Sequence, residues 1–189
     1  MQQLTSKNLK QLLDDPENNS GAIDGVLYDR NTIQPSVVHF GVGNFHRCHQ
    51  AVYMDRLLRR GSNEWGIIGV SMRSTSVRDA LKPQDFLYTE VTLGGQPRFR
   101  IIGSILDILV GPEDPSAVVN LVGETSTKLV TTTITEKGYC LSSGNPDHSD
   151  TGISADKTSL EKPKTIYGYL AAGIILRSDS DAGPLSIVC

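Results

Sequence analysis

The sequence predicts an α/β domain with a mainly parallel, doubly wound sheet that carries an antiparallel hairpin insertion. Short, β-branched apolar runs alternate with segments of helical periodicity and with glycine turns, a pattern typical of strands buried on both faces of a parallel sheet. The chain has 189 residues, enough for one well-buried domain but short for two. We therefore expect one core over residues 36–189, preceded by an N-terminal arm over residues 1–35.

The composition restricts the partners. Hydrophobic residues make up 38% of the chain and charged residues 21%, which suits a globular domain rather than a disordered one. A net charge of -3 gives no basic field for a nucleic acid or an anionic membrane surface. The polar N-terminus and the interrupted apolar runs predict neither an export signal nor a membrane span. Cys48, Cys140 and Cys189 are scattered and odd in number, which fits reduced thiols in the cytoplasm and no metal-binding pattern.

The first elements along the chain are expected to lead into a βαβ unit. Residues 4–13 place leucines on one face of a helix, and the polar stretch 14–25 is rich in turn formers. Residues 37–43, VVHFGVG, predict the first strand, and residues 45–60 predict one continuous helix. Residues 65–70, WGIIGV, predict the second strand and complete the unit.

The next segments predict the hairpin and a return to alternation. Residues 86–93 and 98–105 are expected to form antiparallel strands joined through Gly94 and Gly95, at one edge of the sheet. Residues 115–122 predict a short helix, and residues 128–135, KLVTTTIT, predict another central strand.

The last segments are expected to close the domain incompletely. Residues 142–163 are polar and predict a surface loop. Residues 165–177 predict a helix whose apolar side chains are available for burial, namely Ile166, Tyr169, Leu170, Ile174 and Leu176. Residues 185–189 predict a strand without the helix that a doubly wound sheet needs next, so we expect the chain to be truncated.

The turn after the first strand carries the clearest functional pattern. It consists of Gly41, Val42, Gly43, Asn44, Phe45, His46 and Arg47. In dinucleotide-binding folds the first glycine permits a tight turn and the second lets a phosphate approach the backbone. His46 stands where the third glycine is usual, so this pattern alone is compatible with a plain tight turn or a cofactor site. The side chains of His46 and Arg47 either meet solvent and cap carbonyls or lie beside a pyrophosphate.

Five segments in order and spacing resemble the mannitol dehydrogenase family, the polyol-specific long-chain dehydrogenases. They read GVGNFHRCHQAVYMDRL, WGIIGVSMRS, RDALKPQDFLYTEV, RIIGSILDIL and TITEKGYC. The resemblance runs from about Tyr28 to Cys189, and F-H-R after G-x-G is distinctive of the group. The family includes mannitol 2-dehydrogenase and the fructuronate (mannonate) oxidoreductases.

The resemblance implies an oxidoreductase that moves a hydride between a polyol or aldonate alcohol and a nicotinamide without a metal, with NAD as the commoner cofactor. This chain would supply the Rossmann-like NAD(P)-binding part. In the family a mostly helical second domain follows and supplies a lysine base, so we expect no catalytic residue here and no activity of this chain alone. The segments VSMRS and RDALKPQD favour the mannonate and fructuronate branch over mannitol. A non-catalytic dinucleotide-binding module is the alternative.

Two other segments supply candidate cofactor contacts. Glu136 and Lys137 lie in a match to the family's T-E-K-G-Y at the end of a predicted parallel strand, with a solvated pair as the alternative. After the second predicted strand no carboxylate is present to bind the ribose of NAD. Arg73, with the nearby Ser71, Ser74 and Thr75, would suit the 2′-phosphate of NADP. NADP therefore stays open beside NAD, and a solvated Arg73 is the alternative. His39 is expected to be a hydrogen-bonded core histidine rather than a ligand.

Overall fold

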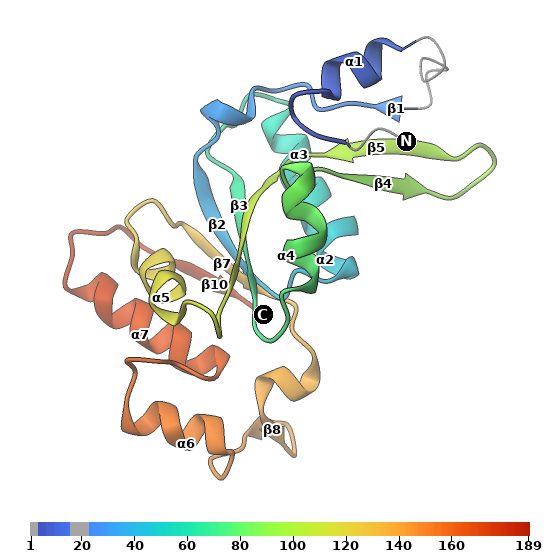
Figure 1. Cartoon of the computed structure of the whole chain (residues 1–189). Helices are drawn as coiled ribbons and strands as arrows, with labels where there is room; N and C mark the ends of the chain where they lie inside the picture. Colours follow the sequence, from blue (N-terminus) through green and yellow to red (C-terminus); the bar gives the residue numbers. More distant parts are fainter. Residues whose placement is uncertain (1–3, 16–22) are drawn as a thin grey trace.

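The computed structural model describes residues 4–15 and 23–189 (Figure 1). Its centre is a five-stranded sheet in the order β10-β7-β2-β3-β6, with all neighbouring strands parallel. The strands are β2 (Pro35–Phe40), β3 (Gly66–Ser71), β6 (Ile105–Val110), β7 (Leu129–Thr132) and β10 (Ser186–Val188). The chain builds outward from β2 through β3 to β6 and then returns to the other side of β2 with β7. The predicted doubly wound α/β fold is confirmed.

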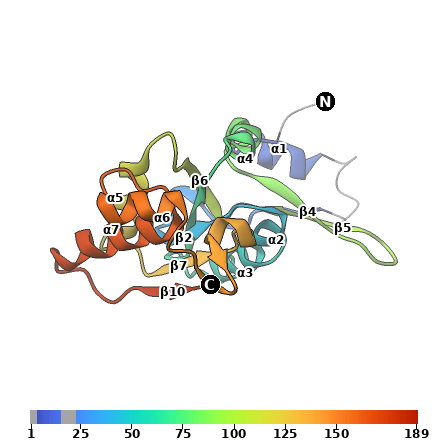
Figure 2. The same ribbon diagram turned by 90° about the horizontal axis from the view of Figure 1, so that it is seen from below.

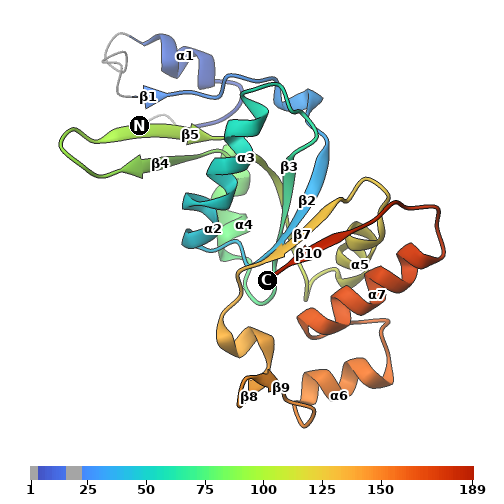
Figure 3. The same ribbon diagram turned by 180° about the vertical axis from the view of Figure 1, so that it is seen from behind.

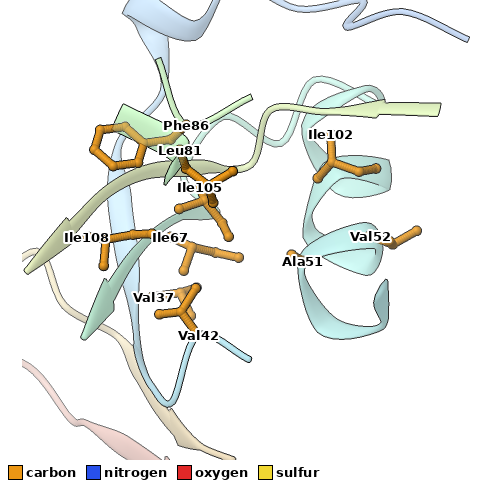
Figure 4. Packing of buried hydrophobic residues seen from close by; sticks show 10 residues of the cluster. All are labelled: Val37, Val42, Ala51, Val52, Ile67, Leu81, Phe86, Ile102, Ile105 and Ile108. Atoms are coloured by element: carbon orange, nitrogen blue, oxygen red, sulfur yellow. The ribbon is translucent and has the colours of Figure 1, made fainter. Parts of the chain in front are cut away.

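Alternate residues of the central strands pack on opposite faces of this sheet, each against its own helices. On one face Val37 and Ile67 pack against Ala51 of α3 (Gln50–Leu58) and Leu81 of α4 (Ser76–Leu81), in the cluster that Figure 4 shows. On the other face Val38, Val70 and Val130 belong to a second cluster with α5 (Pro115–Gly123) and α7 (Ile166–Ser178). Figure 2 shows α5 and α7 grouped apart from α2 and α3. Burial of both faces explains why these strands read as continuous apolar runs.

The predicted single helix over residues 45–60 is two helices, α2 (Asn44–Cys48) and α3. His49 leaves the helical region, with φ of -123° and ψ of -84°, and its ring nitrogen Nδ1 lies 2.8 Å from the carbonyl oxygen of Phe45. A side chain that binds a carbonyl one turn back competes with the backbone ladder and accompanies a kink. The single-helix prediction was therefore wrong at His49.

The predicted hairpin is present but forms a separate sheet. β4 (Tyr88–Thr92) and β5 (Arg98–Ile102) pair antiparallel, and β1 (Ile23–Asp24) adds to β5 in parallel. This three-stranded sheet projects away from the helices α5 to α7 (Figure 3). The prediction that the hairpin lies at an edge of the main sheet was wrong. The extended segment is interrupted at residues 103–104, and the chain then enters the main sheet as β6, a strand that the sequence pattern missed.

Ion pairs fasten the arm and this small sheet to α3. Arg59 bonds the buried carboxylate of Asp55 at 2.6 Å and Asp24 of β1 at 2.8 Å, and Arg100 of β5 reaches Asp24 at 3.0 Å. Tyr28 donates a further hydrogen bond to Asp55. The predicted arm helix is present as α1 (Leu9–Asp14), while most of the polar stretch 14–25 lies outside the described residues.

Two predictions for the C-terminal third were wrong in part. The expected loop over residues 142–163 contains α6 (Thr151–Thr158), capped by Asp150, whose carboxylate accepts from the amides of Gly152 and Ile153 at 2.8 and 3.0 Å. Ile174 and Leu176 of α7 are 46% and 43% exposed rather than buried. Leu176 still lies against Gly123 of α5, and Gly173 of α7 lies against Val122 of α5. Shorter elements are the 3-10 turns at Arg30–Thr32, Lys82–Gln84 and Glu136–Tyr139 and the strand pair β8 (Leu141–Ser142) and β9 (Asn145–Pro146).

No helix in the described ranges is long and apolar enough to cross a bilayer.

Candidate functional site

A cavity of about 280 Å³ lies at the carboxyl ends of three adjacent strands. It is lined by residues 41–43 after β2, residues 71–74 with Ser76 and Val77 after β3, and residues 133–135 with Gly138 after β7. The strand order reverses between β2 and β7, and in open α/β sheets ligands bind at such a switch point, outside the carboxyl ends of the strands. A larger cavity of about 660 Å³ borders α6 and α7, away from these strand ends.

Gly41 makes the tight turn that the sequence predicts. Its φ of +99° lies in the region that side chains disfavour. A Cβ atom at this position would lie 2.6 Å from the carbonyl oxygen of Thr133. The Gly41 amide donates to Val70 of β3 at 2.9 Å, and Thr133 donates back to Phe40 at 2.9 Å. Glycine at this position is therefore required by the junction of three strands.

Gly43 has no such requirement. Its φ of -78° and ψ of -179° are extended, and the nearest non-neighbouring atom to an added Cβ would be the Gly41 oxygen at 4.0 Å. Neither strain nor packing explains a glycine at this position, and the residue lines the cavity. The bare backbone of Gly43 leaves a cradle that a side chain would fill, as close approach of a phosphate requires.

The amides open to a ligand are not those of the two glycines. Gly41 donates to Val70, and Gly43 donates to the Gly41 oxygen at 2.7 Å. The first amides of a helix have no carbonyl one turn earlier to bind, and in α2 these belong to Asn44, Phe45 and His46. Of these residues Asn44 and Phe45 are exposed, whereas His46 is completely buried. Within the predicted anion cradle over residues 41–47, the free backbone amides therefore lie in the second half, at the start of α2.

Arg47 braces this turn from within. Its guanidinium donates to the Val42 carbonyl at 2.8 Å and to the side chain of Asn44, while Tyr88 donates to the Arg47 carbonyl at 2.7 Å. Of the two alternatives predicted for Arg47, the structure favours capping of neighbouring carbonyls over a free donor beside a pyrophosphate. The geometry thus gives this side chain a supporting position in the turn.

His46 is corrected more strongly. Its side chain is completely buried, so it neither meets solvent nor lies beside a phosphate. The ring stacks on that of His39, with centroids 3.5 Å apart and planes 10° apart. His39 is the hydrogen-bonded core histidine that the sequence predicted, since its nitrogens lie 2.6 Å from the Thr131 hydroxyl and 2.8 Å from the Thr133 hydroxyl. The whole residue His46 is 0% exposed, so its backbone amide is not open to a ligand either.

The stacked histidines form a neutral floor beneath the glycine turn. Burial lowers the pKa of His39 to about 4, and burial together with the adjacent His39 ring lowers the pKa of His46 to about 3. Gln50 links the two rings, because its Oε1 lies 3.0 Å from both His46 and Thr131. The His46 Nε2 is buried with no hydrogen-bond partner in the described part of the chain. His39 also reaches the Gly41 carbonyl at 3.1 Å, so this network holds the turn from below.

The remaining candidates divide between the cavity and the solvent. Arg73 lines the cavity and is exposed. Glu136 and Lys137 are exposed and do not line it, although Thr135 and Gly138 of the same segment do. A cofactor contact of Glu136 or Lys137 therefore stays a prediction.

Several lining residues were missed, notably Ser76, Thr133 and Ile134. The signal that would have found them is position alone, because each follows a parallel strand and all such ends meet at one edge.

The described residues contain no group of three or more histidine, cysteine or acidic side chains able to hold a metal.

Comparison with known proteins agrees with this geometry. Residues 35–189 match the model of the mannitol dehydrogenase Rossmann domain. The chain belongs to the mannitol dehydrogenase family. Among similar members, a polyol:NADP oxidoreductase of Gluconobacter oxydans is 34% identical over 98% of this chain and 38% of its own length. A mannitol 2-dehydrogenase of Pyrenophora tritici-repentis is 34% identical over 98% of this chain and 32% of its own length.

Solved structures of family members share the fold. The Pseudomonas fluorescens mannitol 2-dehydrogenase ternary complex with NAD and D-mannitol superimposes with a TM-score of 0.89 at 32% identity, over 100% of this chain and 38% of that one. A substrate-free D-sorbitol dehydrogenase gives a TM-score of 0.86 at 31% identity, over 98% and 39%. The chain therefore spans between about a third and two fifths of the length of these members of the mannitol dehydrogenase family.

Proposed function

We propose that this domain binds a nicotinamide adenine dinucleotide, NAD(H) or NADP(H), with its diphosphate beside Gly43 and the opening amides of α2. The observation that carries the proposal is Gly43, a glycine that the fold does not need, beside open space in a cavity at the switch point of the sheet. Membership of the mannitol dehydrogenase family supports it. We assign the cofactor domain to residues 36–189 and the arm to residues 1–35.

The residues of the chain have separate tasks in this proposal. Gly41 turns the backbone, Arg47 and the stacked histidines hold that turn, and Asn44 and Phe45 present amides to the anion. Thr133 and Thr135 lie at the end of β7, on the opposite side of the cavity from the β3 loop. When bound, the nicotinamide supplies the hydride acceptor or donor. The residues of this chain bind and orient the nicotinamide, and none of them is assigned as a catalytic base.

The similar proteins are longer than this chain, and the reaction is proposed for a protein of their full length. We infer hydride transfer between nicotinamide and a secondary alcohol of a polyol or sugar acid, since the similar proteins carry the names of polyol, mannitol and sorbitol dehydrogenases. The mannonate and fructuronate branch stays a prediction. The 189-residue chain by itself should not turn over mannitol, mannonate or fructuronate, and robust turnover would contradict a purely cofactor-binding role.

A binding experiment tests the first half of the proposal. NADH should bind the wild-type chain, and titration calorimetry should show Gly43→Val to weaken it at least about tenfold, or about 1.4 kcal/mol, because the valine side chain fills the cradle. Stability in urea should change by less than about 1 kcal/mol, since the backbone there is extended.

The matched control is Gly95→Val in the β4–β5 turn, another glycine with open space around it. It should leave the affinity for NADH unchanged. Equal binding by wild type and Gly43→Val, or no binding of NADH and NADPH by wild type, would reject the proposed site.

A further inference from the structure

We infer that Arg73 selects the ribose of the nucleotide, and that the cavity binds the 2′-phosphorylated form, NADP(H), more tightly than NAD(H). The inference rests on the proposed function and adds its cofactor specificity. It concerns residues 71–76, from the end of β3 to the start of α4. These residues take no part in the proposed diphosphate cradle.

The position of this segment follows from the sheet. β3 is the direct neighbour of β2, and the Gly41 amide donates to the Val70 carbonyl at 2.9 Å. The residues after β3 therefore form the cavity wall next to the glycine turn. In dinucleotide-binding folds the end of the second strand meets the adenine ribose, where an acidic side chain binds the 2′-hydroxyl of NAD or an arginine accommodates the 2′-phosphate of NADP.

The charge at this position favours the phosphate. Arg73 is the charged side chain among the described residues that line the cavity, and no Asp or Glu is among those lining residues. In the described ranges no carboxylate lies within 4.0 Å of its guanidinium. A guanidinium with free donors binds phosphate through charge-assisted, often bidentate hydrogen bonds. NAD, by contrast, would find no carboxylate to accept its ribose hydroxyls.

A second arginine nearby shows what an unavailable guanidinium looks like. Arg78 of α4 bonds Asp79 at 2.9 Å and also binds Glu113. These two carboxylates are therefore paired outside the cavity, and neither of them lines it. Arg73 and Arg78 are five positions apart in the sequence, yet only Arg73 presents an unpaired charge to the cavity.

The neighbouring side chains leave room for a phosphate. Ser74 and Ser76 both line the cavity, and their hydroxyls lie 2.9 Å apart, with the Ser76 amide donating to Ser74 at 3.1 Å. Small hydroxyl side chains beside a guanidinium can donate to phosphate oxygens. Among similar proteins the names include a polyol:NADP oxidoreductase and an NAD complex, so both forms occur in the family.

The test compares nucleotides and variants on the 189-residue chain by titration calorimetry. Wild type should bind NADPH about tenfold or more tightly than NADH, and 2′,5′-ADP more tightly than 5′-AMP. Arg73→Gln should weaken the binding of NADPH about tenfold and change the affinity for NADH less than about twofold. Arg73→Asp should reverse the preference, so that NADH binds more tightly than NADPH. Raising the salt concentration should weaken NADPH more than NADH, because the extra contact is ionic and exposed.

Arg78→Gln is the control, since it removes a nearby positive charge whose partners lie outside the cavity. It should leave the NADPH to NADH ratio unchanged. NADH binding as tightly as NADPH, or equal losses of both nucleotides in Arg73→Gln, overturns the inference while leaving the proposed function standing. Failure of wild type to bind either nucleotide overturns both.

Discussion

The two neighbouring walls of the cavity are built in different ways. The turn after β2, residues 41–47, is fixed by a strained glycine, a guanidinium bound to its own backbone and a buried histidine pair. The segment from the end of β3 to the start of α4, residues 71–76, has an exposed Arg73 and short-range hydrogen bonds between Ser74 and Ser76. In the proposed complex, the diphosphate that NAD and NADP share would lie against a surface determined by the core. The ribose 2′ position, where the two differ, would meet side chains that the fold leaves free to change.

The largest expected effect is on the rigid wall. Gly41→Ala should reduce the free energy of unfolding by about 3 kcal/mol or more, because it adds left-handed strain and overlaps the Thr133 carbonyl. Urea unfolding measures the change. Gly61→Ala separates the two causes, since Gly61 also has positive φ but nothing within 4 Å of an added Cβ. It should cost about 1 kcal/mol. Equal costs at both positions would show that the junction with β7 is not tight.

The buried histidines give the same wall a dependence on pH. Their pKa values are lowered in the folded protein, so the unfolded chain binds more protons between pH 6.5 and about 4. Stability is fully present above pH 6.5 and falls as the pH drops, by roughly 3 kcal/mol from His39 at pH 4. His46→Phe keeps a ring over His39 and removes one titrating group. Urea unfolding across this range should show a shallower decline for the variant, and parallel curves would contradict the assignment.

The smallest expected effect is on the other wall. Ser74→Ala should change the free energy of unfolding by less than about 0.5 kcal/mol, because its hydrogen bonds are local and exposed. Thermal or urea unfolding measures this. A loss above about 1 kcal/mol would mean that the loop after β3 is also determined by the core, and the contrast between the walls would fail.

The sequence predicted the parts of this protein whose information is local. The β-branched runs of β2, β3 and β7 are recognisable because both faces of each strand are buried. Gly41 and Gly43 were found because two glycines between a buried strand and a helix form a local pattern that is typical of a phosphate-binding turn. The domain boundary, at residues 35 and 36, remains a prediction supported by the extent of the family match.

Features that depend on distant contacts were missed. The helix α6 is stabilised by Asp156, which accepts three hydrogen bonds from residues 164–165. The kink at His49 is a local exception, because its side chain binds a carbonyl four residues earlier and the spacing of apolar residues does not report this. Burial of His46 depends on His39 of another element. No periodicity within one segment reports such pairings. The sequence likewise does not report which residues of the 135–138 segment line the cavity, since the direction of a side chain in a 3-10 turn is set by its neighbours.

The placement of β7 beside β2 has a consequence for how the protein is made. Val38 is opposite Val130 in the register, so the cavity needs a pairing between segments that are far apart along the chain. Such nonlocal pairings form slowly, because the chain loses the entropy of closing a long loop before the stabilising contacts form. A nascent chain on the ribosome has no nucleotide site until β7 has emerged, and the nucleotide therefore cannot guide the early steps of its folding.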